Sequence, residues 1–192
     1  MAIFLALVHH PCLDRQGKVV TTALTNVDVH DLARSGRTFG AEALYIVTPV
    51  TLQLRMVAEI TEHWTEGQAS GHLRRKEALR RVTGVASLHD AAADVERRTG
   101  SKPLVAVTGA QMRAPTHSFA ELRKRLREPG PPVLLVFGTG WGLTAEVIDA
   151  AEVRLPPIIR DPGLPSGDAG YNHLSVRAAA AIALDRLLGE AG

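Results

Sequence analysis

The chain has 192 residues, of which 45% are hydrophobic, and its 22 basic and 20 acidic side chains leave a formal net charge of +2. These values exclude a disordered chain and predict a globular protein with a substantial core. Cys12 is the only cysteine, which excludes an internal disulfide and a cysteine-based metal cluster and fits a reducing cytoplasm. The apolar residues 2–8 are too few to span a bilayer and lack the flanks of a secretion signal, so we expect no membrane partner.

The first hundred residues alternate between strand and helix patterns. Short apolar runs predict strands at residues 3–8, 44–47 and 82–86. Helical spacing of apolar residues predicts helices at 28–39, from Pro49 to about Trp64, and from Ser87 to about Arg98. We expect Asp28 to cap the first of these helices.

The second half continues the alternation. It predicts strands at 104–108 and 133–137, each followed by a helix, then an extended piece at 153–159 and a Pro/Gly-rich loop at 160–170. The pair Ser118 and Glu121 matches a helix capping box. The last helix, about 172–188, is apolar on most sides and must therefore be covered on most sides, which predicts packing inside the fold and against a second subunit. The whole pattern predicts an α/β fold, with a mostly parallel sheet and helices on both faces.

The chain is organised around residues 133–143, Val-Leu-Leu-Val-Phe-Gly-Thr-Gly-Trp-Gly-Leu. A buried strand that ends in a glycine turn and leads into a helix is the arrangement by which α/β proteins bind nucleotide-like ligands. Gly138, Gly140 and Gly142 alternate with other residues, which is not the spacing of the dinucleotide fingerprint. On this stretch alone, a tight turn without a ligand explains the glycines equally well.

Three segments together resemble a known family. They are residues 25–40 (Thr-Asn-Val-Asp-Val-His-Asp-Leu-Ala-Arg-Ser-Gly-Arg-Thr-Phe-Gly), residues 137–143 and residues 171–177 (Tyr-Asn-His-Leu-Ser-Val-Arg). In order and spacing they are similar to the three motifs of the SPOUT class of S-adenosylmethionine-dependent RNA methyltransferases, and most of all to an uncharacterised RNA methyltransferase group of that class. The resemblance covers nearly the whole chain as a single domain. It implies a C-terminal trefoil knot, a homodimer, S-adenosylmethionine as cofactor and a structured RNA, tRNA or rRNA, as substrate.

Carried over position by position, the resemblance places the cofactor in three loops within about residues 104–188. Leu155, Ile158 and Leu174 would enclose the faces of the adenine. The implied cofactor-binding residues are Thr108, Gly109, Phe137, Gly138, Thr139, Gly140, Gly142, Leu155, Pro157, Ile158, Asn172, Leu174 and Ser175.

The resemblance also implies a catalytic set of Arg34, Asn172 and Ser175, in which Arg34 orients an RNA phosphate or stabilises the attacking atom. A solvated helix arginine is the alternative for Arg34. Basic side chains that would contact RNA phosphates are Arg34, Arg37, Arg74, Arg75 and Arg123, although a solvated charged face explains the basic runs nearly as well. Methyl transfer from a sulfonium needs no metal, and we expect none.

Three positions depart from the family pattern. Gly140 stands where members that methylate ribose carry a glutamate, Asp28 stands where an asparagine is usual, and residues 171–173 read Tyr-Asn-His in place of Ser-Leu-Asn. The acceptor, a ribose oxygen or a base nitrogen, therefore stays open. Two alternatives remain: a catalytically inactive RNA-binding dimer with the same fold and, less favoured, a Rossmann-type dinucleotide-binding enzyme. His9, His10, His30 and His173 include candidate proton acceptors, but each is more simply a structural hydrogen bonder.

Overall fold

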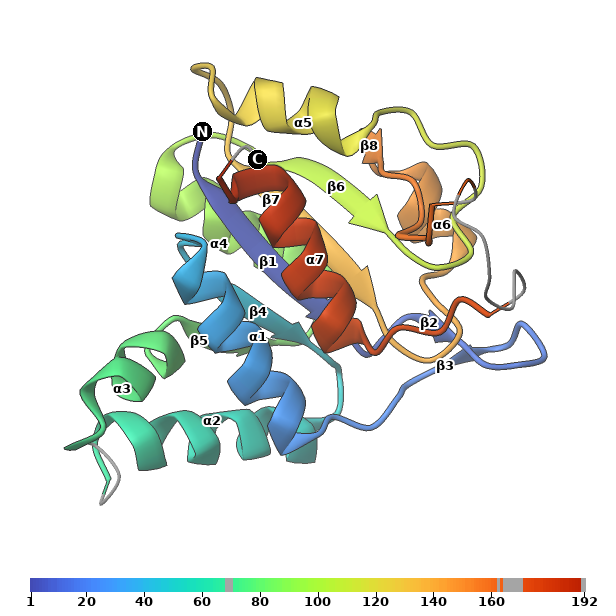
Figure 1. The fold of residues 1–192 in the computed structure, drawn as a ribbon. Helices are drawn as coiled ribbons and strands as arrows, with labels where there is room; N and C mark the ends of the chain where they lie inside the picture. Colours follow the sequence, from blue (N-terminus) through green and yellow to red (C-terminus); the bar gives the residue numbers. More distant parts are fainter. Residues whose placement is uncertain (68–70, 162, 164–170, 191–192) are drawn as a thin grey trace.

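A computed structural model of the chain describes residues 1–67, 71–161, 163 and 171–190. Its centre is a six-stranded sheet in the order β5-β4-β1-β7-β6-β8, in which every pairing is parallel (Figure 1). The strands are β1 (Ile3–Val8), β4 (Leu44–Val47), β5 (Val82–Val85), β6 (Leu104–Thr108), β7 (Val133–Gly138) and β8 (Val153–Arg154). A separate antiparallel hairpin is formed by β2 (Cys12–Leu13) and β3 (Val19–Val20). The predicted α/β class with a mostly parallel sheet is confirmed.

Helices cover both faces of this sheet, because alternate side chains of its buried strands point to opposite sides. One core contains Leu5 and Leu135 and is covered by α1 (Asn26–Thr38), α2 (Thr51–Thr65), α3 (Leu73–Leu79), α5 (Phe119–Leu126) and α7 (Val176–Leu188). The other contains Phe4 and Leu134 and is covered by α4 (Leu88–Thr99) and α6 (Ala145–Asp149). In Figure 1, α7 and α1 lie in front of the sheet and α4 lies behind it. No helix in the described ranges has both the length and the hydropathy that a membrane span requires.

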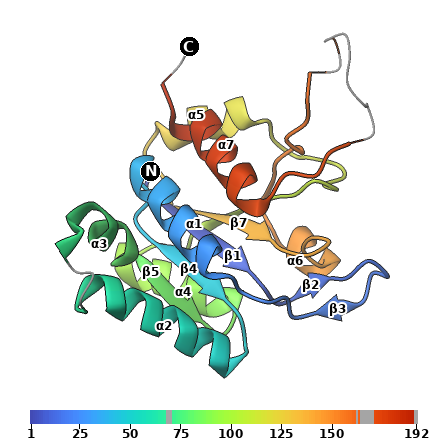
Figure 2. The ribbon, with the colours of Figure 1, turned by 60° about the horizontal axis from the view of Figure 1, so that its bottom comes forward.

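The strand order places a switch point at the centre of the sheet. From β1 the chain adds β4 and β5 outward on one side, whereas β7, β6 and β8 occupy the other side. The loops that follow β1 and β7 therefore leave from neighbouring strands at the same carboxyl edge, which is where open α/β sheets bind ligands. Figure 2 shows the hairpin β2–β3 projecting from this edge next to α6.

Two predicted helix starts are wrong. The Thr25 side chain caps α1 by accepting a hydrogen bond from the Asp28 amide, so the helix begins at Asn26 and Asp28 is its third residue, not its cap. The last helix begins at Val176 rather than near 172, because Ser175 caps it in the same way. The capping box of Ser118 and Glu121 is confirmed.

Two elements were not predicted, namely the hairpin β2–β3 and α3. Each strand of the hairpin has only two residues, too few for a periodic pattern, and α3 lies in a basic run with few apolar side chains. Most of the predicted loop at 160–170 lies outside the described residues. Because the knot would involve that segment, the trefoil knot stays a prediction.

Candidate functional site

The loops that follow β6 and β8 meet at the carboxyl edge of the sheet. The backbone amide of Leu155 donates to the carbonyl of Val107, at 2.9 Å. The hydroxyl of Thr108, a buried side chain at the end of β6, donates to the carbonyl of Pro156, at 3.4 Å. These contacts bring the first predicted cofactor loop against the third.

The glycine turn after β7 is held by the loop that follows β1. Both the backbone amide and the hydroxyl of Thr139 donate to the carbonyl of Val8, at 3.2 and 2.9 Å. The amide of Trp141 donates to the carbonyl of Leu13, and the amide of Leu13 donates to the carbonyl of Gly142, both at 2.9 Å. The hairpin that begins at Cys12 therefore fixes the shape of the predicted cofactor turn.

Gly140 occupies the left-handed backbone region, which residues with a side chain rarely adopt. Its φ is +61°, and a Cβ there would lie 2.9 Å from the carbonyl oxygen of Leu13 and 3.1 Å from Cγ2 of Thr22. A glutamate cannot replace this glycine unless the hairpin moves. The packing of the turn against the hairpin thus requires a glycine at this position.

An ion pair between the half-buried Arg177 and the buried Asp28 joins the first resembling segment to the third. The carboxylate of Asp28, a buried side chain, accepts a hydrogen bond from Nη1 of Arg177 at 2.6 Å and another from the Thr25 hydroxyl at 2.5 Å. Nε of Arg177 also lies 3.6 Å from Oδ2 of Asp31. The aspartate that replaces the usual asparagine thus has a specific cationic partner, which packs the start of α7 against α1.

His9 directly follows β1 and is fully buried. Its Nδ1 is 2.9 Å from the hydroxyl oxygen of Thr22, which in turn is 2.5 Å from that of Thr139. Within the part of the chain that the structure describes, Nε2 has no hydrogen-bond partner. Burial lowers the pKa of the imidazole below its usual 6.5, and the negative charge of Asp28 opposes this only partly. His9 is therefore a neutral, structural histidine at neutral pH.

A cavity of about 520 Å³ lies between α1 and the start of α7. It is lined by Arg34, Ser175 and Arg177, among others, so two of the three predicted catalytic residues share one cavity. The Ser175 hydroxyl accepts the amide of Ala178 at 3.2 Å as the helix cap. Asn172, the third predicted residue, is half-buried just ahead of this helix and is not among the lining residues.

A second and larger cavity, of about 930 Å³, lies between α1 and α3. Four of the five predicted RNA-binding arginines line it, namely Arg34, Arg37, Arg74 and Arg75. Arg123 is elsewhere, on α5, where its guanidinium donates to the carbonyls of Arg186 and Gly189 at the end of α7. Trp64 and His72 also line this cavity and were not predicted as site residues, although His72 closely precedes a basic run in the sequence.

Comparison with known proteins identifies the family. A family model described as SAM-dependent RNA methyltransferase matches residues 2–189. The chain belongs to this family. The resemblance found in the three sequence segments is confirmed, S-adenosylmethionine is the family's cofactor, and the Rossmann-type alternative is left without support.

Individual relatives agree with this assignment. The chain is 44% identical, over 98% of its length, to a protein of Oleidesulfovibrio alaskensis named tRNA (guanine-N(1)-)-methyltransferase, but it spans only 42% of that relative. It is 33% identical to an uncharacterised protein of Aquifex aeolicus, over 96% of the chain and 87% of the relative. Solved structures with the same fold include the SpoU methyltransferase AviRb of Streptomyces viridochromogenes, at TM-score 0.58 and 14% identity, covering 97% of this chain and 58% of that one. TrmJ of Zymomonas mobilis (Z. mobilis ZM4) matches at TM-score 0.57 and 15% identity, over 99% of this chain and 69% of that one.

The residues present at the edge of the sheet fit the family's cofactor. The glycine turn exposes backbone at Gly142, whose φ is +108° and around whose Cβ position there is open space. Half-buried Ile158 and exposed Leu174 offer apolar surface to an adenine, whereas Leu155 and Phe137 are fully buried in the core and offer mainly their backbone. Among the described residues, no group of three or more His, Cys, Asp or Glu side chains is placed to hold a metal ion.

Replacement of Gly140 by alanine tests the packing of the turn. We expect Gly142→Ala to cost about 1 to 2 kcal/mol of unfolding free energy, since it brings only the strain of a positive φ. Gly140→Ala should cost a further ~1 to 3 kcal/mol, because its methyl group also meets the Leu13 carbonyl. Urea unfolding of both variants measures the difference, and equal losses would contradict the proposed contact.

The buried His9 predicts a pH dependence of stability. The unfolded chain takes up a proton on His9 near pH 6.5 and the folded chain does so only at lower pH, so this histidine makes stability fall as the pH drops below 6.5. Its contribution to the slope is at most ~1.4 kcal/mol per pH unit. Urea unfolding above and below pH 6.5 should show a smaller slope for His9→Gln than for the wild type. His89→Gln, which changes an exposed histidine on α4, should keep the wild-type slope.

Proposed function

We propose that this chain transfers a methyl group from S-adenosylmethionine to a nucleotide of a structured RNA, a tRNA or an rRNA. The observation that carries this proposal is the cavity between α1 and α7. It joins Arg34, the motif-one arginine, to Ser175, which ends the third cofactor loop. The proposed site of substrate activation would thus lie next to the third cofactor loop, which reaches this cavity at Ser175. We further propose that the 192 residues form one domain, that its cofactor loops lie within about residues 104–188, and that the protein acts in the cytoplasm.

Some residues of the chain would bind the cofactor, and others would position the RNA substrate. Bound S-adenosylmethionine supplies a methyl group activated by the sulfonium. The backbone of the turn at 138–142, Ile158 and Leu174 would hold the adenosine part, and Asn172 would set the outer limit of the pocket. Arg34, an exposed side chain on a rigid helix, would orient an RNA phosphate or stabilise charge on the attacking atom.

The acceptor atom is a finer question. Two relatives carry the name tRNA (guanine-N(1)-)-methyltransferase, and the chain corresponds to 42% of each. A ring nitrogen of guanine in tRNA is therefore one candidate acceptor, and a ribose oxygen is the other. The inactive RNA-binding alternative rested on the missing glutamate at position 140. The closed turn around Gly140 weakens that reason, because this turn has no space for any side chain at that position.

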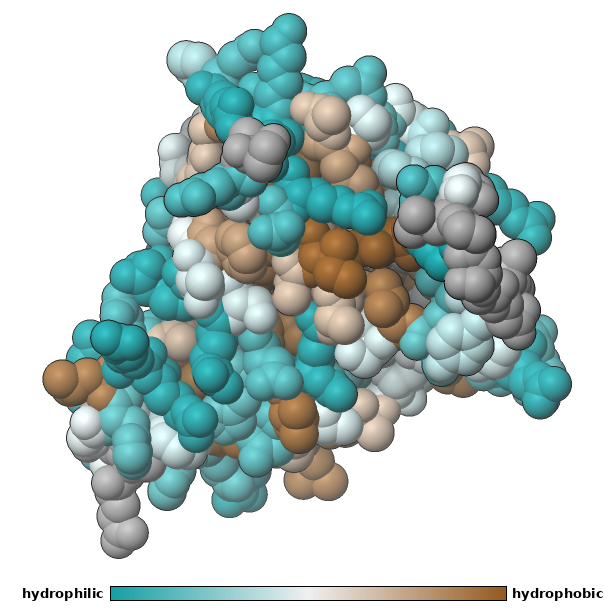
Figure 3. Space-filling view, viewed as in Figure 1, coloured by the Kyte–Doolittle hydropathy of each residue, from teal (hydrophilic) through white to brown (hydrophobic). Residues whose placement is uncertain are grey.

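We propose that two copies associate through the outer face of α7. Ala180, Ala183, Leu184 and Leu187 of this helix are buried in the core. The opposite face carries Ala178, Ala179, Ala181 and Ile182, which are half-buried, and hydrophobic side chains gather over α7 at the centre of the view in Figure 3. Small side chains on a helix allow a second backbone to approach closely. Since Ala178 and Ala181 also line the cavity of Arg34, a partner subunit there would complete its wall.

Calorimetric titration tests the assignment of the cofactor loops. We expect S-adenosylmethionine and S-adenosylhomocysteine to bind the purified protein and NAD not to bind. Asn172→Ala should weaken both cofactors. Arg34→Ala should keep their affinity and lower methyl transfer to tRNA or rRNA by about 100-fold, the usual effect of removing one donor that stabilises the transition state. Failure of the folded wild type to bind either methionine-derived ligand would refute the methyltransferase proposal.

Sedimentation measurements test the proposed dimer. Ile182→Glu places a charge in the centre of the apolar face of α7 and should convert the dimer into a monomer. Leu52→Glu changes a similarly apolar side chain that is 75% exposed on α2 and should leave the dimer intact. A wild-type monomer at all concentrations, or an Ile182→Glu variant that remains a dimer, would contradict the proposed interface.

A further inference from the structure

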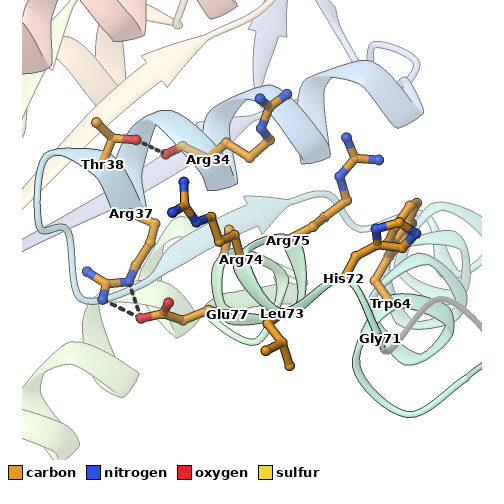
Figure 4. A pocket seen from close by; sticks show the side chains of 11 residues that line it. Arg34, Arg37, Thr38, Trp64, Gly71, His72, Leu73, Arg74, Arg75 and Glu77 are labelled. Atoms are coloured by element: carbon orange, nitrogen blue, oxygen red, sulfur yellow. Dashed lines mark hydrogen bonds and ion pairs between the residues drawn. The ribbon is translucent and has the colours of Figure 1, made fainter.

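The cavity between α1 and α3 is separate from the predicted cofactor loops. Side chains of α1 and α3 line it, and Trp64, near the end of α2, lines it at one side (Figure 4). Figure 4 shows the guanidinium groups of Arg74 and Arg75, on α3, in the space toward α1, that of Arg34 over α1 itself, and that of Arg37 turned toward Glu77. We call this feature the α1–α3 groove.

The charge of the α1–α3 groove is largely unbalanced. Arg37 is neutralised by an ion pair with Glu77, and this contact holds the pKa of the Glu77 carboxyl below its usual range. By contrast, Arg34, Arg74 and Arg75 form no ion pair with any residue that the structure describes. Three uncompensated guanidinium groups along one groove repel each other and favour a ligand with several negative charges.

An aromatic platform lies at one end of these charges. The guanidinium carbon of Arg75 is 4.5 Å from the centroid of the Trp64 ring, a cation–π contact. The rings of His30 and His72 approach the same indole, with centroids 5.3 and 5.8 Å away. A guanidinium already stacked on an indole leaves its other planar face free for a nucleobase, and bases that are unstacked bind such planes in RNA-binding proteins.

We propose that the α1–α3 groove binds an unpaired segment of the RNA substrate. Arg34 and Arg74 contact consecutive phosphates, and one base stacks on the Arg75–Trp64 pair. An unpaired strand fits better than a duplex, because duplex bases are stacked on each other and present no face to an aromatic side chain. The inference rests on the proposed function in taking the ligand to be the RNA that is methylated.

Arg34 gives the groove a direction. It lines both the α1–α3 groove and the cavity shared with Ser175, and no other arginine lines both. A strand held in the groove therefore passes Arg34 on its way to the proposed site of methyl transfer. The groove would grip nucleotides next to the target, while the cavity between α1 and α7 receives the target itself.

Fluorescence anisotropy with a labelled oligouridylate, which forms no duplex, measures this binding directly. We expect saturable binding whose affinity falls with salt. Arg74→Gln should reduce the slope of log K against log salt by about 0.7, the value for one phosphate of a single strand, whereas Arg75→Gln removes the guanidinium on which the base stacks and should weaken binding with a smaller change in slope. Arg127→Gln removes an exposed arginine at the end of α5, on the far side of the molecule, and should not change the slope.

Variants of Trp64 provide a second test, because their effect depends on base stacking and would be absent if the groove bound RNA by charge alone. Trp64→Leu should weaken oligouridylate binding about tenfold, whereas Trp64→Phe should keep most of the affinity because a ring can still stack. Intrinsic fluorescence should be quenched on binding in the wild type and not in Trp64→Phe, in which Trp141 is the remaining tryptophan. Circular dichroism and S-adenosylhomocysteine binding show that each variant is folded.

Several outcomes would overturn the inference. They are unchanged RNA affinity in the Arg74 and Arg75 variants, equal and equally sensitive binding of an RNA duplex, and full competition by inorganic phosphate or by polyglutamate at matched ionic strength. Failure of the groove is distinguishable from failure of the proposed function. If the enzyme methylates RNA with the same KM after Arg74→Gln and Arg75→Gln, the proposed function is correct and the inference about the groove is wrong. If the protein binds oligouridylate through these residues but binds no S-adenosylhomocysteine, the inference about the groove is correct and the methyltransferase proposal is wrong.

Discussion

The adjacency of β1 and β7 is the constraint on which the rest of the site depends. Because these two central strands are parallel neighbours, the loop after one must lie against the loop after the other. Thr139 makes this contact twice, through its amide and its hydroxyl, to the last carbonyl of β1. The hairpin β2–β3 then locks the glycine turn from outside. A loop with three glycines would otherwise be among the least ordered parts of the chain, so its shape is supplied by tertiary contacts.

A second constraint links the two ends of the chain. Asp28 and Arg177 are 149 residues apart and form an ion pair at 2.6 Å, with the carboxylate buried. Burial of a carboxylate is costly unless its hydrogen bonds are satisfied, and here Thr25 and Arg177 satisfy it. The main effect of this ion pair is therefore to set how α7 packs on α1, and its net contribution to stability is small. The cavity that Arg34 and Ser175 line lies beside this ion pair, since Arg177 lines it as well.

The sequence predicted the elements well where a local signal determined them, as at the capping box of Ser118 and in the apolar run of β7. It predicted four arginines of the α1–α3 groove as RNA contacts, but not that they line one groove, since that depends on how α1 packs on α3. Trp64 looked like an ordinary core position of a helix. The closed turn at Gly140 was also beyond prediction: a glycine is visible in the sequence, but the carbonyl that excludes a side chain there belongs to Leu13.

These contacts hold α1 in place between the cavity that it forms with α7 and the α1–α3 groove. Near its start, Asp28 is tied to Arg177 of α7, and near its end, Arg37 is tied to Glu77 of α3. Arg34 lies between these two ties and lines the cavity on each side. A helix fixed at both ends can hold a flexible arginine within a small region, which loop residues cannot do. The proposed RNA contact at α3 and the proposed role of Arg34 in methyl transfer would therefore both depend on the position of this one helix.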